Sequence, residues 1–437
     1  MGTSDPPAAS PITLPNQRRL LPVAAGVIFA LGLGLSAVRI TPASSAEGLG
    51  VAAPWVLTDF RAAVYYPARA FLDGANPYNS KRYLARYPAG EPFPLYLPAT
   101  LILGLPFALL PQPLAGTTYL VLTVALTLFL AWAVLRLAGF SPRRAAIIAV
   151  AGAILLSRPG HWNLLSGQVT IPIVLGVYMS LALAQRRPPL AGIGLAISLL
   201  KPTFGLPLIP LLLAGGARRA VIYGLALSAA LNLPIVFTLM RQEGGVSSFL
   251  DVLIRDHEAF AAQSSNDPAL STWRVDLSAG LSRVQGAPLK PIVEGALALG
   301  ILGLASLAIG RLKAFRRARD HRVIAGLVCC ALLLSLYHQA YDLLLLTLPA
   351  VQLVVAWTQR DASRAVLCGQ GVLFCVLAVN YVATEWLLAA VRPTASTRLA
   401  ILSINCLVLL ALFALYLIEA VRQPSRSPQS AAIGPAG

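Results

Sequence analysis

Few side chains in this 437-residue chain could act chemically on a polar substrate, and several of them stand beside apolar segments. Asp59 and Arg61 follow the first apolar segment at a distance of one or two helical turns. A carboxylate shielded from bulk water at a membrane surface can act as a general base toward a hydroxyl nucleophile. The same carboxylate could instead cap a helix expected at 60–72, where negative charge meets the helix dipole. The sequence leaves both interpretations of Asp59 open.

Lys201 interrupts an apolar stretch at Leu199-Leu200-Lys201-Pro202. A lysine at membrane depth costs about 2.5 kcal/mol or more, so such a residue favours a functional role. The partner expected for its charge is the phosphate of an anionic lipid. The alternative is a lysine whose apolar stem lies in the membrane while its ammonium group reaches the interface.

His338 and Asp342 lie four residues apart, so on a helix they would share one face. A histidine oriented by a carboxylate could bind or protonate a departing phosphate oxygen. The alternative for His338 is a solvent-facing residue in a turn. The chain has four histidines and no HxxxH pattern, which predicts neither a metal site nor a cofactor. A pair of outer carboxylates still leaves open a weakly bound divalent cation.

Further polar and aromatic residues could contact a sugar or an acceptor. Tyr65 and Tyr66 taken singly resemble the aromatic anchors of a membrane interface. The charged run 255–258 is interpreted as a solvated helix face. The residues predicted to bind a sugar or acceptor are Tyr65, Tyr66, Asn76, Tyr78, Asn163, Gln168 and Asp342.

The composition indicates what kind of fold must position these residues. The chain is 57% hydrophobic and only 12% charged, with a mean hydropathy of +0.73, whereas soluble domains carry about 25% charged residues. Apolar runs of roughly 20 residues recur, which is typical of membrane-spanning helices. The net charge of +17 comes mostly from arginines at the ends of apolar runs, so it argues for cytoplasmic loops and against a nucleic-acid partner. We therefore predict an all-α polytopic membrane protein embedded in a lipid bilayer.

The basic pairs also predict a topology. Placing them in the cytoplasm gives about twelve crossings, with both termini cytoplasmic, in the plasma membrane. The segment 95–110 then stays outside as an interfacial or re-entrant helix, and three segments are short for about 30 Å of hydrocarbon. The predicted spans are 20–40, 114–138, 145–157, 169–185, 190–200, 203–213, 219–240, 291–310, 323–336, 340–357, 365–389 and 399–421.

This topology places the candidate residues on the extracytoplasmic face. It predicts one integral membrane domain, 1–437, with a first outer loop at 41–94 that carries interfacial helices. A short outer turn is expected at 158–168, a second long outer loop at 241–290 and a disordered cytoplasmic tail at 423–437. No glycine-rich phosphate loop is present, which argues against a soluble nucleotide as the energy-rich substrate.

The pattern resembles a known family. Asp59-Phe60-Arg61, with Tyr65-Tyr66 and Pro77-Tyr78, resembles the first outer loop of glycosyltransferase family 87, of the GT-C superfamily. Gly167-Gln168, followed by Ala191-Gly192 and Lys201, resembles that family's GQ, AG and K stretch. The resemblance extends over about residues 50–350. It rests on the order of these motifs more than on any one of them.

The resemblance implies an inverting transferase with a polyprenyl-phosphate sugar donor, usually of mannose, and a lipid or glycan acceptor. Asp59 would be the general base. Lys201 and His338, with Arg61 as a helper, would hold the phosphate on which negative charge develops. The alternative is a transporter or flippase of a lipid-linked saccharide, which would need a polar path through the bundle.

Overall fold

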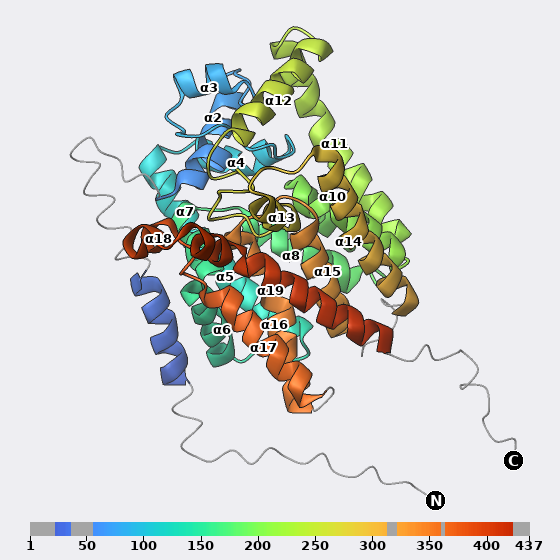
Figure 1. Cartoon of the computed structure of the whole chain (residues 1–437). Helices are drawn as coiled ribbons and strands as arrows, with labels where there is room; N and C mark the ends of the chain where they lie inside the picture. Colours follow the sequence, from blue (N-terminus) through green and yellow to red (C-terminus); the bar gives the residue numbers. More distant parts are fainter. Residues whose placement is uncertain (1–21, 36–55, 313–320, 360–362, 423–437) are drawn as a thin grey trace, which may run out of the picture.

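The computed structural model describes residues 22–35, 56–312, 321–359 and 363–422. Within these ranges the regular secondary structure is helical and no strand is present (Figure 1). The all-α prediction is therefore confirmed for the described residues. Residues 41–55 of the predicted first outer loop and the predicted tail at 423–437 lie outside them.

Long apolar helices make the chain a multi-pass membrane protein. Five helices in the described ranges are long and apolar enough to cross a membrane, or six if the bent pair α6–α7 counts as one span. The predicted number of twelve spans is not confirmed. The five are α5 (Gln112–Leu137), α11 (Arg218–Gln242), α14 (Pro291–Leu312), the run Ala340–Thr358 formed by η4 (Ala340–Leu346) with α16 (Thr347–Gln359), and α19 (Ala395–Arg422).

Shorter helices occupy the other predicted spans. They run for 10–17 residues, and in places packed glycines bring them close together. A Cβ on Gly194 would lie 2.5 Å from the Gly176 carbonyl oxygen, and one on Gly224 would lie 2.7 Å from Leu195. Small residues of this kind let membrane helices approach closely. The helices are Pro22–Leu35, α6 (Arg144–Leu156), α8 (Thr170–Leu183), α9 (Pro188–Leu199), α10 (Pro202–Ala214), α15 (His321–Ser335) and α17 (Arg364–Val379).

Two predicted boundaries are wrong. The turn expected at 158–168 is a helix, α7 (Arg158–Ser166), bent by 79° from α6. Ser157 starts α7 by accepting a hydrogen bond from the Gly160 amide, and Gly167 ends it in the left-handed conformation. The span expected at 365–389 ends with α17 at Val379, and a separate helix, α18 (Glu385–Val391), follows a turn.

The two predicted outer loops are not confirmed. Helices were expected within the first of them and are present in its described part, and the described second one, 241–290, also contains helices. The charged run on α12 is also not fully solvated, because Asp256 is 1% exposed and its carboxylate contacts the Ser80 hydroxyl. The helices at the end of the molecule that is uppermost in Figure 1 are η1 (Phe60–Tyr65), α2 (Tyr66–Leu72), α3 (Ser80–Arg86), α4 (Thr100–Ala108) and α12 (Val246–Ala261). Helix α13 (Leu277–Gln285) lies nearer the middle of the molecule, where it packs against α19.

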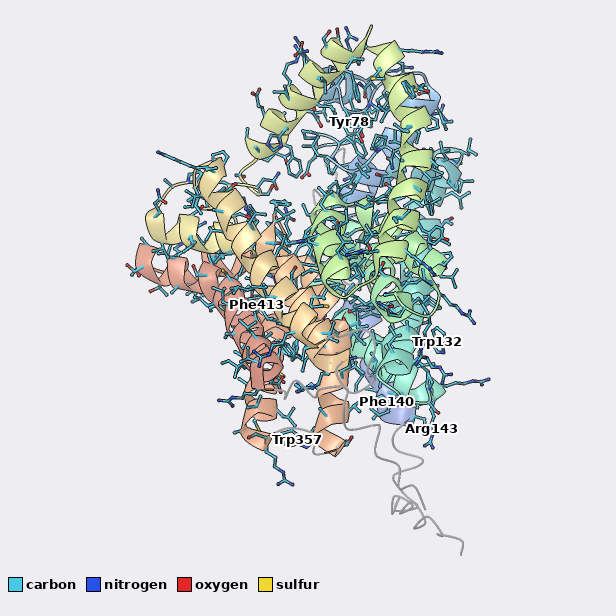
Figure 2. The ribbon with its side chains drawn as sticks, turned by 90° about the vertical axis from the view of Figure 1, so that its right-hand side faces the viewer. Tyr78, Trp132, Phe140, Arg143, Trp357 and Phe413 are labelled. Atoms are coloured by element: carbon cyan, nitrogen blue, oxygen red, sulfur yellow. The ribbon has the colours of Figure 1, made fainter. Side chains whose placement is uncertain are left out.

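Helices η1 to α4 and α12 share an apolar core of their own. Aromatic rings dominate it, for example Phe60, Tyr78, Tyr83 and Phe93, all of which are at most 2% exposed. Figure 2 shows Tyr78 at one end of the molecule and Arg143 at the opposite end. The charge distribution along the sequence predicts this separation of the first outer segment from the basic pair at 143–144.

Candidate active site

The end of α7 holds the segment that carries Asp59. The Leu57 amide donates to the Leu165 carbonyl at 2.9 Å. Gly167, at φ +73°, lies so close to this segment that a Cβ there would meet the Phe60 Cβ at 2.7 Å. Glycine is therefore needed at position 167 for two reasons, its positive φ and the close approach. This contact fixes Asp59 beside α7.

The backbone around Asp59 is irregular. Leu57 has a φ of +53°, which is uncommon for a residue other than glycine, and the helix after Asp59 starts with a π-helical stretch, η1. Strained residues and π-turns occur often at functional sites. The Asp59 side chain makes no capping hydrogen bond to this helix, so the capping interpretation is not supported.

The surroundings of Asp59 suit a general base. Loss of solvation raises the pKa of its carboxyl group to about 7, and the charge of Glu91 acts in the same direction. Hydrogen bonds from Ser166 and Gln168 and the charge of Lys201 act against this rise. The Asp59 residue as a whole is half-buried. A base whose pKa lies near neutrality takes up a proton efficiently and is still ionised at the working pH.

Lys201, Asp342 and His338 form a second buried cluster. The Lys201 Nζ lies 2.6 Å from Asp342 Oδ1, and the three side chains are 3% exposed or less. The Lys201 ammonium also lies 5.2 Å from the Phe204 ring centroid and 4.9 Å from that of Tyr341. Lys201 therefore does not lie at the membrane interface as an exposed charge, and its partner in the described chain is Asp342.

His338 is held at both ring nitrogens. Its Nδ1 lies 3.0 Å from Asp342 Oδ2, and its Nε2 lies 3.2 Å from the Thr203 carbonyl oxygen. The predicted contact between His338 and Asp342 is confirmed, but His338 precedes the helix, and the contact forms because Asp342 and Gln339 cap the start of η4. His338 is fully buried, so the interpretation as a solvent-facing residue is wrong.

Backbone contacts fasten this cluster to distant segments. The Val275 amide donates to the His338 carbonyl at 3.0 Å, and the Ala340 amide donates to the Trp273 carbonyl at 2.7 Å. The Leu97 amide donates to the Leu200 carbonyl at 3.0 Å, directly before Lys201. Segments around residues 97, 200, 275 and 338 are thereby joined at one place, although they are far apart in the sequence.

The two groups of residues share one region. The charge of Lys201 affects the pKa of Asp59, and both Asp59 and Asp342 add to the rise that burial causes in the pKa of Tyr96. The sequence-based prediction did not include Tyr96, Glu91 or Ser166. Glu91 could have been noticed as one of the few acidic residues in the first outer segment, whereas Tyr96 and Ser166 belong to no pattern.

Several buried polar atoms in this region have no hydrogen-bond partner within the described chain. Such atoms are rare and costly in folded proteins, and one explanation for them is a bound ligand. Two belong to residues beside Asp59, and two to residues beside Asp342 and Lys201. They are Arg61 Nε, Gln168 Oε1, Asn163 Oδ1 and Thr203 Oγ1.

Other predicted sugar-binding residues have partners within the protein. The Tyr65 hydroxyl donates to the Leu110 carbonyl at 3.0 Å, and the Tyr78 hydroxyl donates to the Tyr96 carbonyl. Asn163 donates to the Tyr341 carbonyl at 3.0 Å. Tyr66 is partly exposed and stacks edge-on against Tyr65.

Two further observations describe the edges of the site. Asn76 lies away from Asp59, beyond the end of α2, where it donates to Glu243 at 3.1 Å. In the described parts of the chain no group of three or more His, Cys, Asp or Glu side chains is arranged to hold a metal ion.

Comparison with known proteins identifies the family. The model of glycosyltransferase family 87 matches residues 95–337, which is more than half of the chain. Lys201 lies within the matched range, His338 directly follows it, and Asp59 precedes it. No curated protein and no solved structure matches the chain. With its apolar spans and this family match, the chain belongs to glycosyltransferase family 87.

Proposed function

We propose that this membrane glycosyltransferase moves a hexosyl residue, mannosyl by family resemblance, from a polyprenyl-phosphate donor to a lipid or glycan acceptor. The proposal includes a GT-C architecture, an active site on the extracytoplasmic face of the plasma membrane, and inversion at the anomeric carbon. The observation that carries it is the half-buried Asp59, whose carboxyl pKa is raised to about 7, in the same region as Lys201.

In the proposed step, Asp59 takes the proton of an acceptor hydroxyl group while the hydroxyl oxygen bonds to the anomeric carbon of the donor. The bond between that carbon and the phosphate oxygen breaks, and the polyprenyl phosphate leaves with the electron pair. The proton then passes from Asp59 to solvent. Attack from the side opposite the phosphate inverts the configuration in a single displacement.

The leaving phosphate needs donors that face its developing charge. Asp342 balances the Lys201 charge, but a lysine ammonium has three N–H donors and Asp342 occupies one of them in the structure. Arg61 adds a buried Nε, and Thr203 adds a buried hydroxyl group, neither of which has a hydrogen-bond partner among the residues that the structure describes. His338 fixes the Asp342 carboxylate and thereby the direction of Lys201.

The experiment is transfer by purified protein from a panel of short-chain polyprenyl-phosphate sugars, with nucleotide sugars as the comparison donors. The proposal is supported if product forms from one polyprenyl-phosphate sugar and if NMR shows that the anomeric configuration of the product is opposite to that of the donor. Transfer from a nucleotide sugar, or retention of the donor configuration, contradicts it. Donor binding without turnover, combined with donor movement across vesicle membranes, would establish the transporter alternative.

A further inference from the structure

A polar cavity lies at the far end of α2 from Asp59. Its volume is about 240 Å³, and it opens between the end of α2, helix α3 and the end of α11. Fifteen residues separate Asp59 from Gly74, mostly in helix, which corresponds to roughly 20 Å. Its lining residues are Gly74, Ala75, Asn76, Asn79, Arg82, Tyr83, Arg86, Gln242 and Glu243.

Two lining residues carry buried polar atoms that lack a partner in the described chain. These are the hydroxyl oxygen of Tyr83 and the Oε1 atom of Gln242. Tyr83 is 1% exposed, yet its hydroxyl group makes no hydrogen bond to any described residue. An unpaired buried polar atom costs free energy that a ligand with the right groups recovers. The cavity is therefore built to receive a polar ligand.

The charges around the cavity are balanced. Arg82 lies 3.9 Å from Glu243, and Arg86 lies 3.9 Å from Asp73. Each guanidinium group thus faces a carboxylate, which disfavours an anionic ligand. The unpartnered Gln242 Oε1 needs a hydrogen-bond donor, which a phosphate dianion cannot supply and a hydroxyl group can.

Amides, one carboxylate, two guanidinium groups and a phenol around a small cavity match a sugar ring, whose hydroxyl groups both donate and accept. We infer that this cavity is a saccharide subsite for a neutral sugar ring. The assignment of that ring to the acceptor rests on the proposed function. The separation of roughly 20 Å from Asp59 then implies an acceptor with a chain of several sugars, whose distal ring binds here while a hydroxyl group reaches Asp59.

The test is direct binding, measured by calorimetry on the full-length protein. The probes are short neutral gluco-, galacto- and manno-oligosaccharides, offered both free and attached to a lipid, with inorganic phosphate as competitor. Tyr83→Phe removes only the unpartnered hydroxyl group, and Gln242→Leu replaces the amide that carries the unpartnered oxygen by an apolar group of similar size. Tyr223→Phe is the matched control, because this tyrosine is 48% exposed on α11 and does not line the cavity.

We expect each cavity variant to weaken binding of an oligosaccharide roughly fivefold, the size of one neutral hydrogen bond, and the control to leave it unchanged. If the cavity variants bind the free oligosaccharide more weakly, the glycan alone is recognised. If they bind only the lipid-linked form more weakly, the ligand is a glycolipid. Equal binding by all variants, or displacement of the sugar by phosphate, would overturn the inference. Absence of any transfer activity would contradict the proposed function but would leave this binding test valid.

Discussion

Asp59 shows how one residue acquires a chemical role from its surroundings. The sequence identified it among the few charges next to an apolar segment, but it could not decide between a base and a helix cap. The structure favours the base, because the side chain makes no capping bond and its pKa is raised to about 7. The raised pKa comes first from burial and then from the charge of Glu91, and both depend on tertiary contacts that no local pattern reveals, although Glu91 itself stands out as an acidic residue in the sequence.

The raised pKa predicts the pH dependence of transfer. Asp59 accepts a proton only when ionised, so kcat/KM should fall as the pH drops through about 7 and level off above it. Replacing Glu91 by Gln removes a negative charge that raises this pKa, so the midpoint should move to lower pH. A profile of kcat/KM against pH for both proteins checks this, and an unmoved midpoint in Glu91→Gln would contradict it.

The buried pair of Lys201 and Asp342 predicts a stability effect. Lys201→Met leaves the Asp342 carboxylate buried without its cation, which costs about 3–5 kcal/mol when a buried pair is broken. The double variant Lys201→Met with Asp342→Leu removes both charges and should recover much of the loss. Thermal unfolding in detergent measures the stability of the single and the double variant. A double variant no more stable than the single one would contradict the ion-pair explanation.

The presence of helices was predicted more successfully than their lengths and the bends between them. Each of the twelve apolar segments proposed from the sequence contains a helix within its described residues, since hydrophobicity is a local property. The bend of 79° between α6 and α7 was missed, because it lies at the Ser157 cap, where Gly160 packs so closely that a Cβ there would lie 2.0 Å from the Ile154 carbonyl oxygen. The contact between His338 and Asp342 was expected on a helix face and instead arises at the capped start of η4.

The close approach at Gly167 gives a prediction at the level of the element. Gly167→Ala would push the segment carrying Asp59 away from α7, and a displacement near 1 Å can cost roughly a hundredfold in rate. The matched control is Gly139→Ala, which has a similar φ of +89° but no atom within 4 Å of the added Cβ. Both variants should lose similar stability from backbone strain, and only Gly167→Ala should lose activity. Equal activities would show that this contact does not position Asp59.

The whole molecule has two ends of different character. One end carries the short helices with the aromatic core and the polar cavity, and the other carries Arg143 (Figure 2). Charge counting along the sequence predicted this separation, because basic residues mark one side of a membrane. The number of spans could not be predicted in the same way, since several helices are shorter than a bilayer and depend on neighbouring helices for cover.

This arrangement predicts the result of cysteine labelling in intact cells. Lys81→Cys on α3 should react with a membrane-impermeant maleimide from outside, and Arg143→Cys should react only after permeabilisation. The exposed Cys368 and Cys375 are first replaced by Ala to remove background labelling. Labelling of both reporters from the same side would contradict the proposed topology.

The central claim is that Asp59 is the base of a glycosyl transfer, and Asp59→Asn tests it most directly. Transfer and donor binding are measured on the same purified sample, beside the control Asp251→Asn, an exposed carboxylate on α12. Because the folded-state pKa of Asp59 lies above its ordinary value of 3.8, its ionised form is disfavoured in the fold, so Asn should not lower the unfolding temperature. We predict a loss of transfer of roughly a hundredfold or more with donor binding retained. Transfer by Asp59→Asn at the rate of the unaltered protein would contradict the account.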